Sequence, residues 1–423
     1  EGDEPQAVIG SYLHRYAYPD WFNRHNENGR ELKNASSHGA GEVRCLQLRG
    51  EYLYVAEGRG GLQVYDVASQ ANKGVSQRLI TAPFSPLGHD TQVNSKDATC
   101  VALPTNQPIH PPRNQGEKMR VANLEQPFHP LYNYAYVTDS KEGLILVDVN
   151  TMADGEPRNN FLKRAVTWNP GGVLNGARHI TVGGYYLYIT TAKGVAIVSV
   201  DTPLNPVLIA ELPLRDARST ALQFRYLFVT DADGLKTIDV TDPKAPRLVT
   251  DNTIRMKNAQ RVFVARTYAY VAAGSDGVVI VDVERPERMF EYQRFTAGGK
   301  ITDAHDVIVA TTNASLFMYV ADGKGGLKVV QLTSPASQPK FYGFSPEPKP
   351  ELIAMYSTSK PALSLSKGLE RDRGVDETGG QIAVFGRRGS RPLNLEEMRK
   401  LFLDDKGQPW YVTDQIEQRM SRE

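Results

Sequence analysis

A repeat of about 40 residues recurs six times along the chain and constrains its fold more than any other feature. Each copy has an apolar strand, a Tyr-x-Tyr-Val segment or a close variant, a turn rich in glycine and acidic residues, and an apolar run that usually ends in Asp-Val. The clearest copy has Tyr268–Val271, the turn Gly274–Gly277 and the run Val278–Val283. The pattern alternates as strands do and shows no helical period. It therefore predicts an all-β propeller.

The number of blades depends on how the two ends of the chain are interpreted. Residues Pro350–Tyr356 repeat the pattern of a fourth strand and complete a sixth blade. A degenerate seventh copy follows, with Ala362–Leu365 as its first strand and Gly380–Phe385 as its third. Pro5–Tyr12 has the pattern of a fourth strand with no blade before it, so we expect it to close the last blade and remove an exposed sheet edge. Seven blades are predicted, and six blades are the alternative.

The predicted propeller occupies residues 1–392, and a short C-terminal helix and polar tail occupy 393–423. Three long inserts interrupt the compact repeats, at residues 13–42, 104–131 and 335–349. Loops on a rigid scaffold often carry the function of a protein, and exposed aromatic side chains are frequent anchors of an interface. The first insert holds the residues that we predict to bind a partner, which are Tyr16, Tyr18, Trp21, Phe22 and His25.

Polar residues recur at the start of the innermost strands, where a propeller has its axial channel. One interpretation is that they bind an anion or a substrate in the channel. The other is that they pair with acidic turns of the next blade and lock the blades together. The predicted axial residues are Arg44, Arg178, His179, Arg218, Arg261, His305 and Asp306.

Composition argues against several other functions. The 49 basic and 48 acidic residues nearly cancel, so no global field attracts nucleic acid or an anionic membrane. No run of 18 apolar residues predicts a membrane span. The acidic turns do not supply the ligand spacing that calcium requires, and they also suit tight hairpins. We expect no metal, no cofactor and no catalytic motif.

The two cysteines, Cys45 and Cys100, occupy the same position in the innermost strands of neighbouring repeats. Equivalent positions in adjacent blades usually lie beyond the roughly 7 Å between Cα atoms that a disulfide spans. The spacing therefore favours buried free thiols, with a disulfide as the alternative.

Three of the apolar runs, Gly143–Val149, Gly234–Val240 and Gly277–Val283, resemble the LVIVD repeat, and the resemblance covers roughly residues 43–332. It implies a propeller-like bacterial or archaeal protein, commonly exported or on the cell surface, from a family without a shared catalytic motif. The first residues, Glu1–Pro5, look like a mature end left after removal of a signal peptide. We therefore expect an extracytoplasmic protein, periplasmic or on the cell surface.

These observations favour a non-enzymatic scaffold that binds a protein partner. In its most specific form, the expectation is a haem-free accessory subunit beside multihaem cytochromes in an electron-transfer assembly, because bacterial propellers of this kind accompany electron-transfer proteins. The alternative is an enzyme of the hydrolase or lyase type, with a pocket at the mouth of the propeller axis that uses His179, Arg261 and Asp306. The two differ in whether these side chains converge on an open cavity or are already paired across blades.

Overall fold

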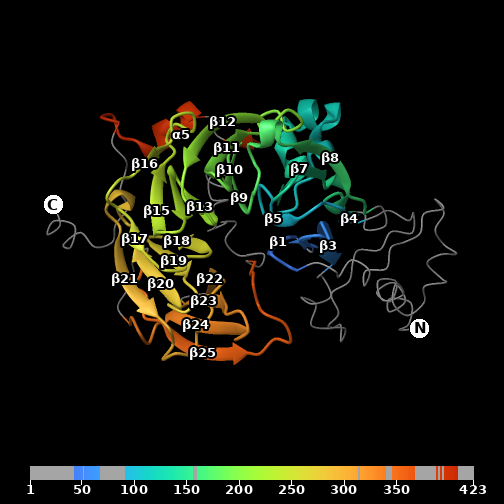
Figure 1. Cartoon of the computed structure of the whole chain (residues 1–423). Helices are drawn as coiled ribbons and strands as arrows, with labels where there is room; N and C mark the ends of the chain where they lie inside the picture. Colours follow the sequence, from blue (N-terminus) through green and yellow to red (C-terminus); the bar gives the residue numbers. More distant parts are fainter. Residues whose placement is uncertain are drawn as a thin grey trace, which may run out of the picture. The chain divides into compact units, whose positions relative to one another are not determined.

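The computed structural model describes residues 42–50, 52–66, 91–155, 160–312, 315–339, 345–366, 387–388, 391–392 and 395–407. These residues form six sheets of four or five strands, which we name blades 1 to 6 in chain order, and one two-stranded ribbon (Figure 1). In blades 1, 2, 4, 5 and 6, neighbouring strands run antiparallel.

The strands of the first three blades are β1 (Cys45–Arg49), β2 (Tyr52–Ala56), β3 (Leu62–Asp66) and β4 (Gln92–Val93); β5 (Ala98–Ala102), β6 (Tyr134–Asp139), β7 (Gly143–Asp148) and β8 (Lys163–Trp168); and β9 (His179–Gly183), β10 (Tyr186–Thr191), β11 (Gly194–Ser199) and β12 (Val207–Pro213). Those of the last three are β13 (Ser219–Gln223), β14 (Tyr226–Thr230), β15 (Gly234–Asp239), β16 (Arg247–Leu248) and β17 (Ile254–Arg255); β18 (Val262–Ala265), β19 (Tyr268–Ala272), β20 (Val278–Asp282) and β21 (Phe290–Phe295); and β22 (Asp306–Thr312), β23 (Ser315–Ala321), β24 (Leu327–Thr333) and β25 (Glu351–Tyr356).

The fold is a six-bladed β-propeller, the alternative considered above, and the described residues form no seventh blade. The predicted first strand, Ala362–Leu365, makes only an isolated bridge between Ala362 and Gly323. The same bridge joins Gly58 to Ala98 and Gly274 to Ala304, where the next blade begins. Residues 362–365 therefore begin as an innermost strand does, but no described partner strand follows. The predicted strands Gly380–Phe385 and Pro5–Tyr12 lie outside the described residues.

The chain divides into two compact units. The first contains residues 1–180, 199–207 and 388–391, and therefore blades 1 and 2. The second contains residues 181–198, 208–387 and 392–423, with blades 4, 5 and 6. The strands of blade 3 are divided between them.

The core of the second unit explains why the third strands are nearly continuous in apolar residues. Every residue of β19 and β20 is buried. Tyr270 and Ile280 pack in a cluster with Met318 of blade 6, whereas Val279 packs in another cluster with Phe228 of blade 4. Because both faces of the sheet are covered, both sets of alternating side chains must be apolar.

The acidic residue that begins the turn between β6 and β7 has a structural role. Asp139 is fully buried and accepts hydrogen bonds from the backbone N–H of Asp97 at 2.6 Å and from those of Lys141 and Glu142 at 2.8 Å. Burial alone would raise the pKa of the Asp139 carboxyl, but these donors hold the pKa below its usual value. The carboxylate thus ties the turn to the segment that precedes the innermost strand, as expected of a structural turn.

Cys45 and Cys100 form a disulfide, so the expectation of free thiols is wrong. Their Cα atoms are 4.7 Å apart, well within disulfide range. The innermost strands β1 and β5 lie closer together than equivalent strands were expected to lie. The side chain of Gln47 holds them there: its Nε2 donates to the carbonyl of Leu103 at 3.4 Å, and its Oε1 accepts from the Leu103 N–H at 2.8 Å.

The C-terminal helix is confirmed as α5 (Leu395–Phe402). Arg399 of this helix forms an ion pair with Asp242 at 3.3 Å, which ties the helix to the loop after β15. Within the described ranges, every helix is too short or too polar to span a lipid bilayer.

Candidate functional site

The predicted axial residues of the first unit lie where the sequence placed them, at the start of innermost strands. Arg44 immediately precedes β1, and its guanidinium forms an ion pair with Asp97, which precedes β5 of the next blade, at 2.8 Å. Arg178 is exposed, and His179 is half-buried at the first position of β9. The Arg44 pair joins consecutive blades.

The axial residues of the second unit make contacts of the same kind. Arg218 bonds Asp216 at 2.7 Å, and it also reaches blade 5, where its Nη1 donates to Asn258 Oδ1 at 3.1 Å and to the Ala259 carbonyl at 2.8 Å. His305 lies 3.1 Å from Asp303, two residues before it. Arg218 therefore also connects its blade to the next one.

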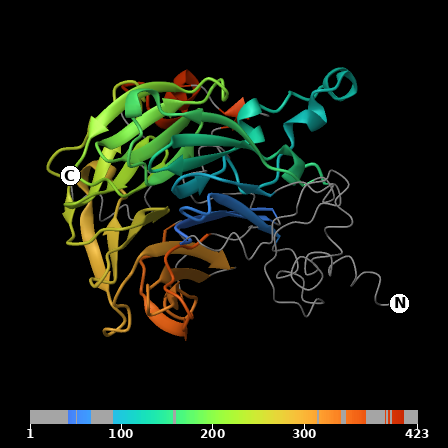
Figure 2. The same cartoon turned by 45° about the vertical axis from the view of Figure 1, so that its right-hand side comes forward.

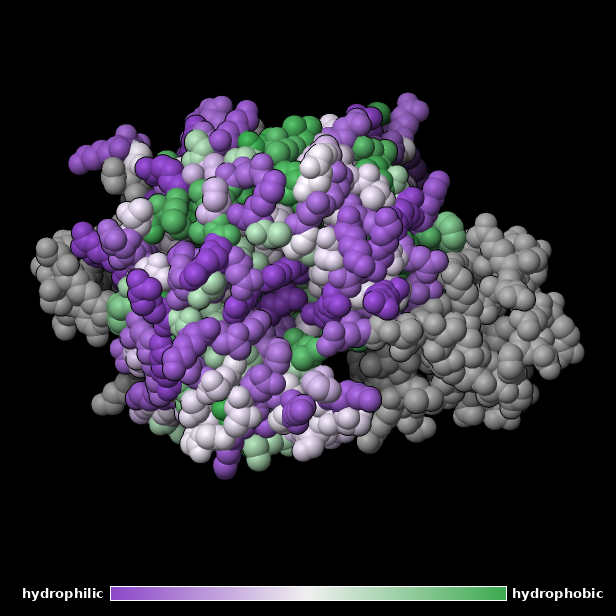
Figure 3. Space-filling model, viewed as in Figure 1, coloured by the Kyte–Doolittle hydropathy of each residue, from purple (hydrophilic) through white to green (hydrophobic). Residues whose placement is uncertain are grey.

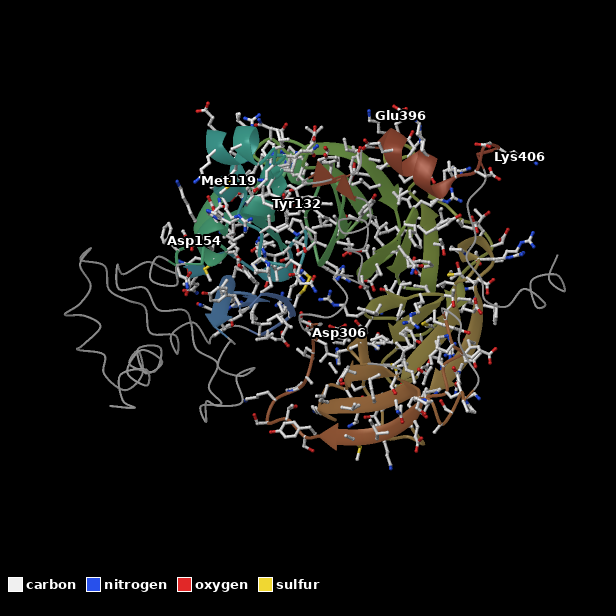
Figure 4. The ribbon with its side chains drawn as sticks, turned by 180° about the vertical axis from the view of Figure 1, so that it is seen from behind. Met119, Tyr132, Asp154, Asp306, Glu396 and Lys406 are labelled. Carbon is white, nitrogen blue, oxygen red and sulfur yellow. A yellow bond between two sulfur atoms is a disulfide. The ribbon has the colours of Figure 1, made fainter. Side chains whose placement is uncertain are left out.

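Arg261 and Asp306 interact in the interior of the second unit. Burial raises the pKa of the Asp306 carboxyl, and the Arg261 charge counteracts part of the rise. Burial likewise lowers the pKa of Arg261, and Asp306 opposes that change. The Asp306 carboxylate also accepts from Leu365 N–H at 2.8 Å and Ser364 Oγ at 3.1 Å, so it holds the segment that follows blade 6 (Asp306 is labelled in Figure 4). These contacts favour the interpretation in which such residues lock blades together.

The five predicted partner-binding residues in the first insert, Tyr16, Tyr18, Trp21, Phe22 and His25, lie outside the described residues. The second insert is described throughout and projects from blade 2 in the first unit (Figure 2). It contains three short helices, which are η2 (Pro111–Asn114), η3 (Lys118–Ala122) and η4 (Pro130–Asn133). Its structure makes it the best-defined candidate for a binding site.

A buried arginine anchors the base of this insert. Arg49, at the end of β1, is 3% exposed. Its Nη2 donates to the Ile109 carbonyl at 2.7 Å and its Nε to the Gln107 carbonyl at 3.3 Å. Burial lowers the pKa of Arg49, while the neighbouring Tyr54 and Tyr132 oppose that change (Tyr132 is labelled in Figure 4). Among the described residues no carboxylate pairs with Arg49, so the two carbonyl groups of the insert satisfy its buried charge and fix the insert to β1.

Further hydrogen bonds hold the insert together above this base. The side chain of Asn114 is 2% exposed; its Nδ2 donates to the Gln126 carbonyl at 2.8 Å, and its Oδ1 accepts from the Phe128 N–H at 3.0 Å. His129 Nδ1 accepts from the Leu131 N–H at 3.1 Å, and His110 Nδ1 lies 3.2 Å from the Asn150 carbonyl. Both histidines thus contribute to the structure of the insert. Among the described side chains, no cluster of three or more His, Cys, Asp or Glu is arranged to hold a metal ion.

The outer part of the insert carries side chains that the fold does not use. Leu124 is 83% exposed, the highest value for a large hydrophobic residue in the described ranges, and Val121 is 66% exposed. Leu124 also has a positive φ of 54°, which is uncommon for a side chain of its size. Sequence reasoning missed these residues because it weighted aromatic anchors. The run from Lys118 to Leu124, with bases and aliphatic residues interleaved in an insert, was the available signal.

Comparison with known proteins supports the repeat assignment. The model of the LVIVD repeat matches residues 40–76, 132–153, 176–212, 214–252, 257–296 and 303–343. Among curated proteins, none matches the sequence.

Solved structures similar to this chain include propellers at low sequence identity. One is the beta-propeller domain of Cps50 (Swd1) from Myceliophteria thermophila, with a TM-score of 0.45, 11% identity, and coverage of 76% of this chain and 88% of that chain. Sqt1 from Saccharomyces cerevisiae has a TM-score of 0.47, 5% identity, and coverage of 78% of each chain. YCF48 bound to D1 peptide has a TM-score of 0.42, 10% identity, and coverage of 69% and 79%.

These likenesses are too weak to carry a functional argument, whereas the repeat matches cover just over half of the 423 residues. Together with the six blades, they show that the chain belongs to the LVIVD-repeat family.

Proposed function

We propose that this protein is a non-enzymatic, extracytoplasmic scaffold that docks a protein partner through the inserts of its blades. The observation that carries the proposal is the contrast within the second insert. Its base is fixed by buried Arg49 and Asn114, while Val121 and Leu124 are presented to solvent. A preorganised loop with exposed apolar side chains loses little conformational entropy on binding, which is what a docking surface requires.

Two further observations support the proposal. Polar side chains that an enzyme would need at the propeller axis are engaged with neighbouring blades, as in Arg44 with Asp97 and Arg261 with Asp306. The Cys45–Cys100 disulfide supports an extracytoplasmic location, because disulfides persist mainly in oxidising compartments. In its finer form, the proposal places the partner among multihaem cytochromes and includes Tyr16–His25 of the first insert in the interface.

The test is purification of the tagged protein from its native cells, with wild type compared to Trp21→Ala/Phe22→Ala and to Val121→Ser/Leu124→Ser. We expect a partner to co-purify with the wild type and to be reduced at least tenfold in one of the variants, with unchanged thermal stability. Haem absorbance in the eluate tests the finer form. Retention of all partners by both variants, with a turnover that Arg261→Ala abolishes, would favour the enzyme instead.

A further inference from the structure

The exposed part of the second insert is basic as well as apolar. We call residues 113–124 the basic-apolar tip. Arg113, Lys118 and Arg120 are exposed there and make no ion pair with a described residue. Elsewhere in the described chain, some exposed arginines, such as Arg215 and Arg247, are paired with carboxylates, whereas others, such as Arg59 and Arg255, make no ion pair with a described residue. The tip therefore carries cations that the fold itself leaves unneutralised.

The carboxylates near the tip do not balance these cations. Glu117 is exposed, but Glu125 is half-buried, with its oxygens 3.4 Å from Asn123 Nδ2 and 3.5 Å from Asn114 Nδ2. The tip has three cations against one carboxylate, a net of +2, and counting Glu125 beside it lowers this to +1. An acidic partner would gain from this local field, and the gain would be screened by salt.

The exposed apolar residues follow directly after the bases in the sequence. Val121 is next to Arg120 and three positions after Lys118, and all three lie within η3. Leu124 lies two residues beyond the end of η3, with a φ of 54°. In Figure 3, hydrophilic and hydrophobic surface lie side by side over the insert, and Figure 4 labels Met119 on its helical segment. The tip thus has two exposed apolar side chains close in sequence to three exposed basic ones.

We propose that the basic-apolar tip binds an acidic protein segment that carries apolar anchor residues. The proposal rests on the scaffold function above and names the chemistry of its partner. Basic and apolar side chains exposed together are typical of an interface, in which apolar anchor residues have polar contacts around them.

The other exposed groups of the tip favour a protein over a lipid surface or a nucleic acid. The side chains of Gln115, Glu117 and Asn123 are exposed there, and each amide nitrogen makes a long hydrogen bond within the insert, Gln115 Nε2 to the Phe128 carbonyl at 3.3 Å and Asn123 Nδ2 to Glu125 at 3.4 Å. The hydrocarbon of a bilayer offers these amides no hydrogen bond, and an anionic surface repels the carboxylate. A polypeptide supplies donors and acceptors for both amides. The described tip has no aromatic side chain on which a base could stack.

The test begins with a photo-crosslinking amino acid placed at Val121 in the protein in native cells, and separately at Phe22 and at Lys244, an exposed position in the second unit. The segment captured from Val121 is sequenced, synthesised and titrated by fluorescence anisotropy. The titrations use wild type, Arg113→Glu/Lys118→Glu/Arg120→Glu, Val121→Ser/Leu124→Ser, and the matched control Lys163→Glu/Lys193→Glu/Lys244→Glu.

We expect an acidic segment with apolar residues, whose affinity falls at least tenfold in each tip variant and changes less than twofold in the control. Raising the salt concentration from about 0.05 to 0.5 M should weaken wild-type binding at least fivefold. A captured segment without acidic excess, or one that binds all variants equally, overturns the proposal. Binding of the wild type to phosphatidylcholine vesicles with 30% phosphatidylserine would also overturn the proposal, if the charge-reversal variant of the tip loses this binding and the other variants keep it.

The outcomes also separate this proposal from the scaffold function. Capture from Phe22 but not from Val121 overturns the acidic-segment proposal and leaves the scaffold function intact. Absence of captured protein from both positions overturns both.

Discussion

Removing the Cys45–Cys100 disulfide is expected to destabilise the first unit strongly. The bond closes a loop with a sequence separation of 55 residues between the innermost strands of blades 1 and 2. In the chain-entropy description, restricting the unfolded chain by a loop of this length contributes about 4 kcal/mol. Domains of ordinary size are stable by about 5–15 kcal/mol, so the cross-link accounts for a large share of the total.

The measurement is guanidinium unfolding of the wild type and of Cys45→Ala/Cys100→Ala, each with and without reductant. Both sulfurs are buried, with Cys45 5% and Cys100 1% exposed, so the reduced samples must be unfolded in reductant and refolded before the titration. The alanine variant also loses packing, at a cost of about 1 kcal/mol or more. The change in the unfolding midpoint that reductant causes in the wild type, minus the change it causes in the alanine variant, therefore measures the contribution of the cross-link. We expect the midpoint to fall with reductant in the wild type only, with a larger denaturant slope because the reduced unfolded chain is more expanded.

Two results would refute this reasoning. Equal midpoints for oxidised and reduced wild type would show that the bond contributes nothing to stability. Alkylation of both thiols in protein unfolded without reductant would show that the bond is absent.

Three further predictions follow from buried groups. Asp139→Asn should lower the free energy of unfolding by about 1–3 kcal/mol at neutral pH, because its backbone donors lose a charged acceptor. Since the folded pKa of Asp139 is depressed, its contribution is present above the unfolded pKa of about 4 and is lost as pH falls through the folded value. The difference in stability between wild type and Asp139→Asn should therefore shrink below about pH 4 in urea titrations, and a constant difference would contradict the assignment. Gly234→Ala should cost about 3 kcal/mol or more, because φ is 140° and a Cβ would lie 2.0 Å from the Ile254 carbonyl oxygen, whereas Gly155→Ala, with open space around it, should cost about 1 kcal/mol by thermal melting. Asp306→Asn should lower the free energy of unfolding by about 1–3 kcal/mol, because the Leu365 N–H and the Ser364 hydroxyl lose a charged acceptor, and a double-mutant cycle with Arg261→Met should be non-additive; additive effects would show that the two residues do not interact.

The blades could be predicted from the sequence because their signal is local. The apolar patterns of β19 and β20 each lie within five residues, and these strands fall on the Tyr268–Val271 and Val278–Val283 segments of the repeat. The number of blades could not be settled in the same way. Ala362–Leu365 matches the pattern of a first strand, but a strand forms only where a neighbour completes its hydrogen bonds, and Ala362 has only a single bridge to Gly323.

The disulfide and the docking surface depended on tertiary contacts that no periodicity reports. The repeat aligned Cys45 with Cys100 correctly, yet the 4.7 Å between their Cα atoms follows from how β1 and β5 approach each other beside Gln47. Likewise, Lys118 and Leu124 can be read from the sequence, but the hydrogen bond by which Arg49 fixes the base of their insert cannot. The general rule for the distance between equivalent strands of adjacent blades was therefore wrong for β1 and β5.

The same contrast explains why function in this chain is expected at its inserts rather than at its strands. The side chains of the strands are needed for the fold. Both faces of β20 pack in hydrophobic clusters with neighbouring blades, and polar residues such as Arg218 donate hydrogen bonds to the next blade. Changing any of them leaves a cavity or an unpaired buried group, which costs stability. The exposed residues Arg120, Val121 and Leu124 of the basic-apolar tip have no such role in packing. Substitutions there should alter binding while leaving the free energy of unfolding within about 0.5 kcal/mol of wild type. A tip variant that unfolds as readily as Asp306→Asn would show that these residues support the fold instead.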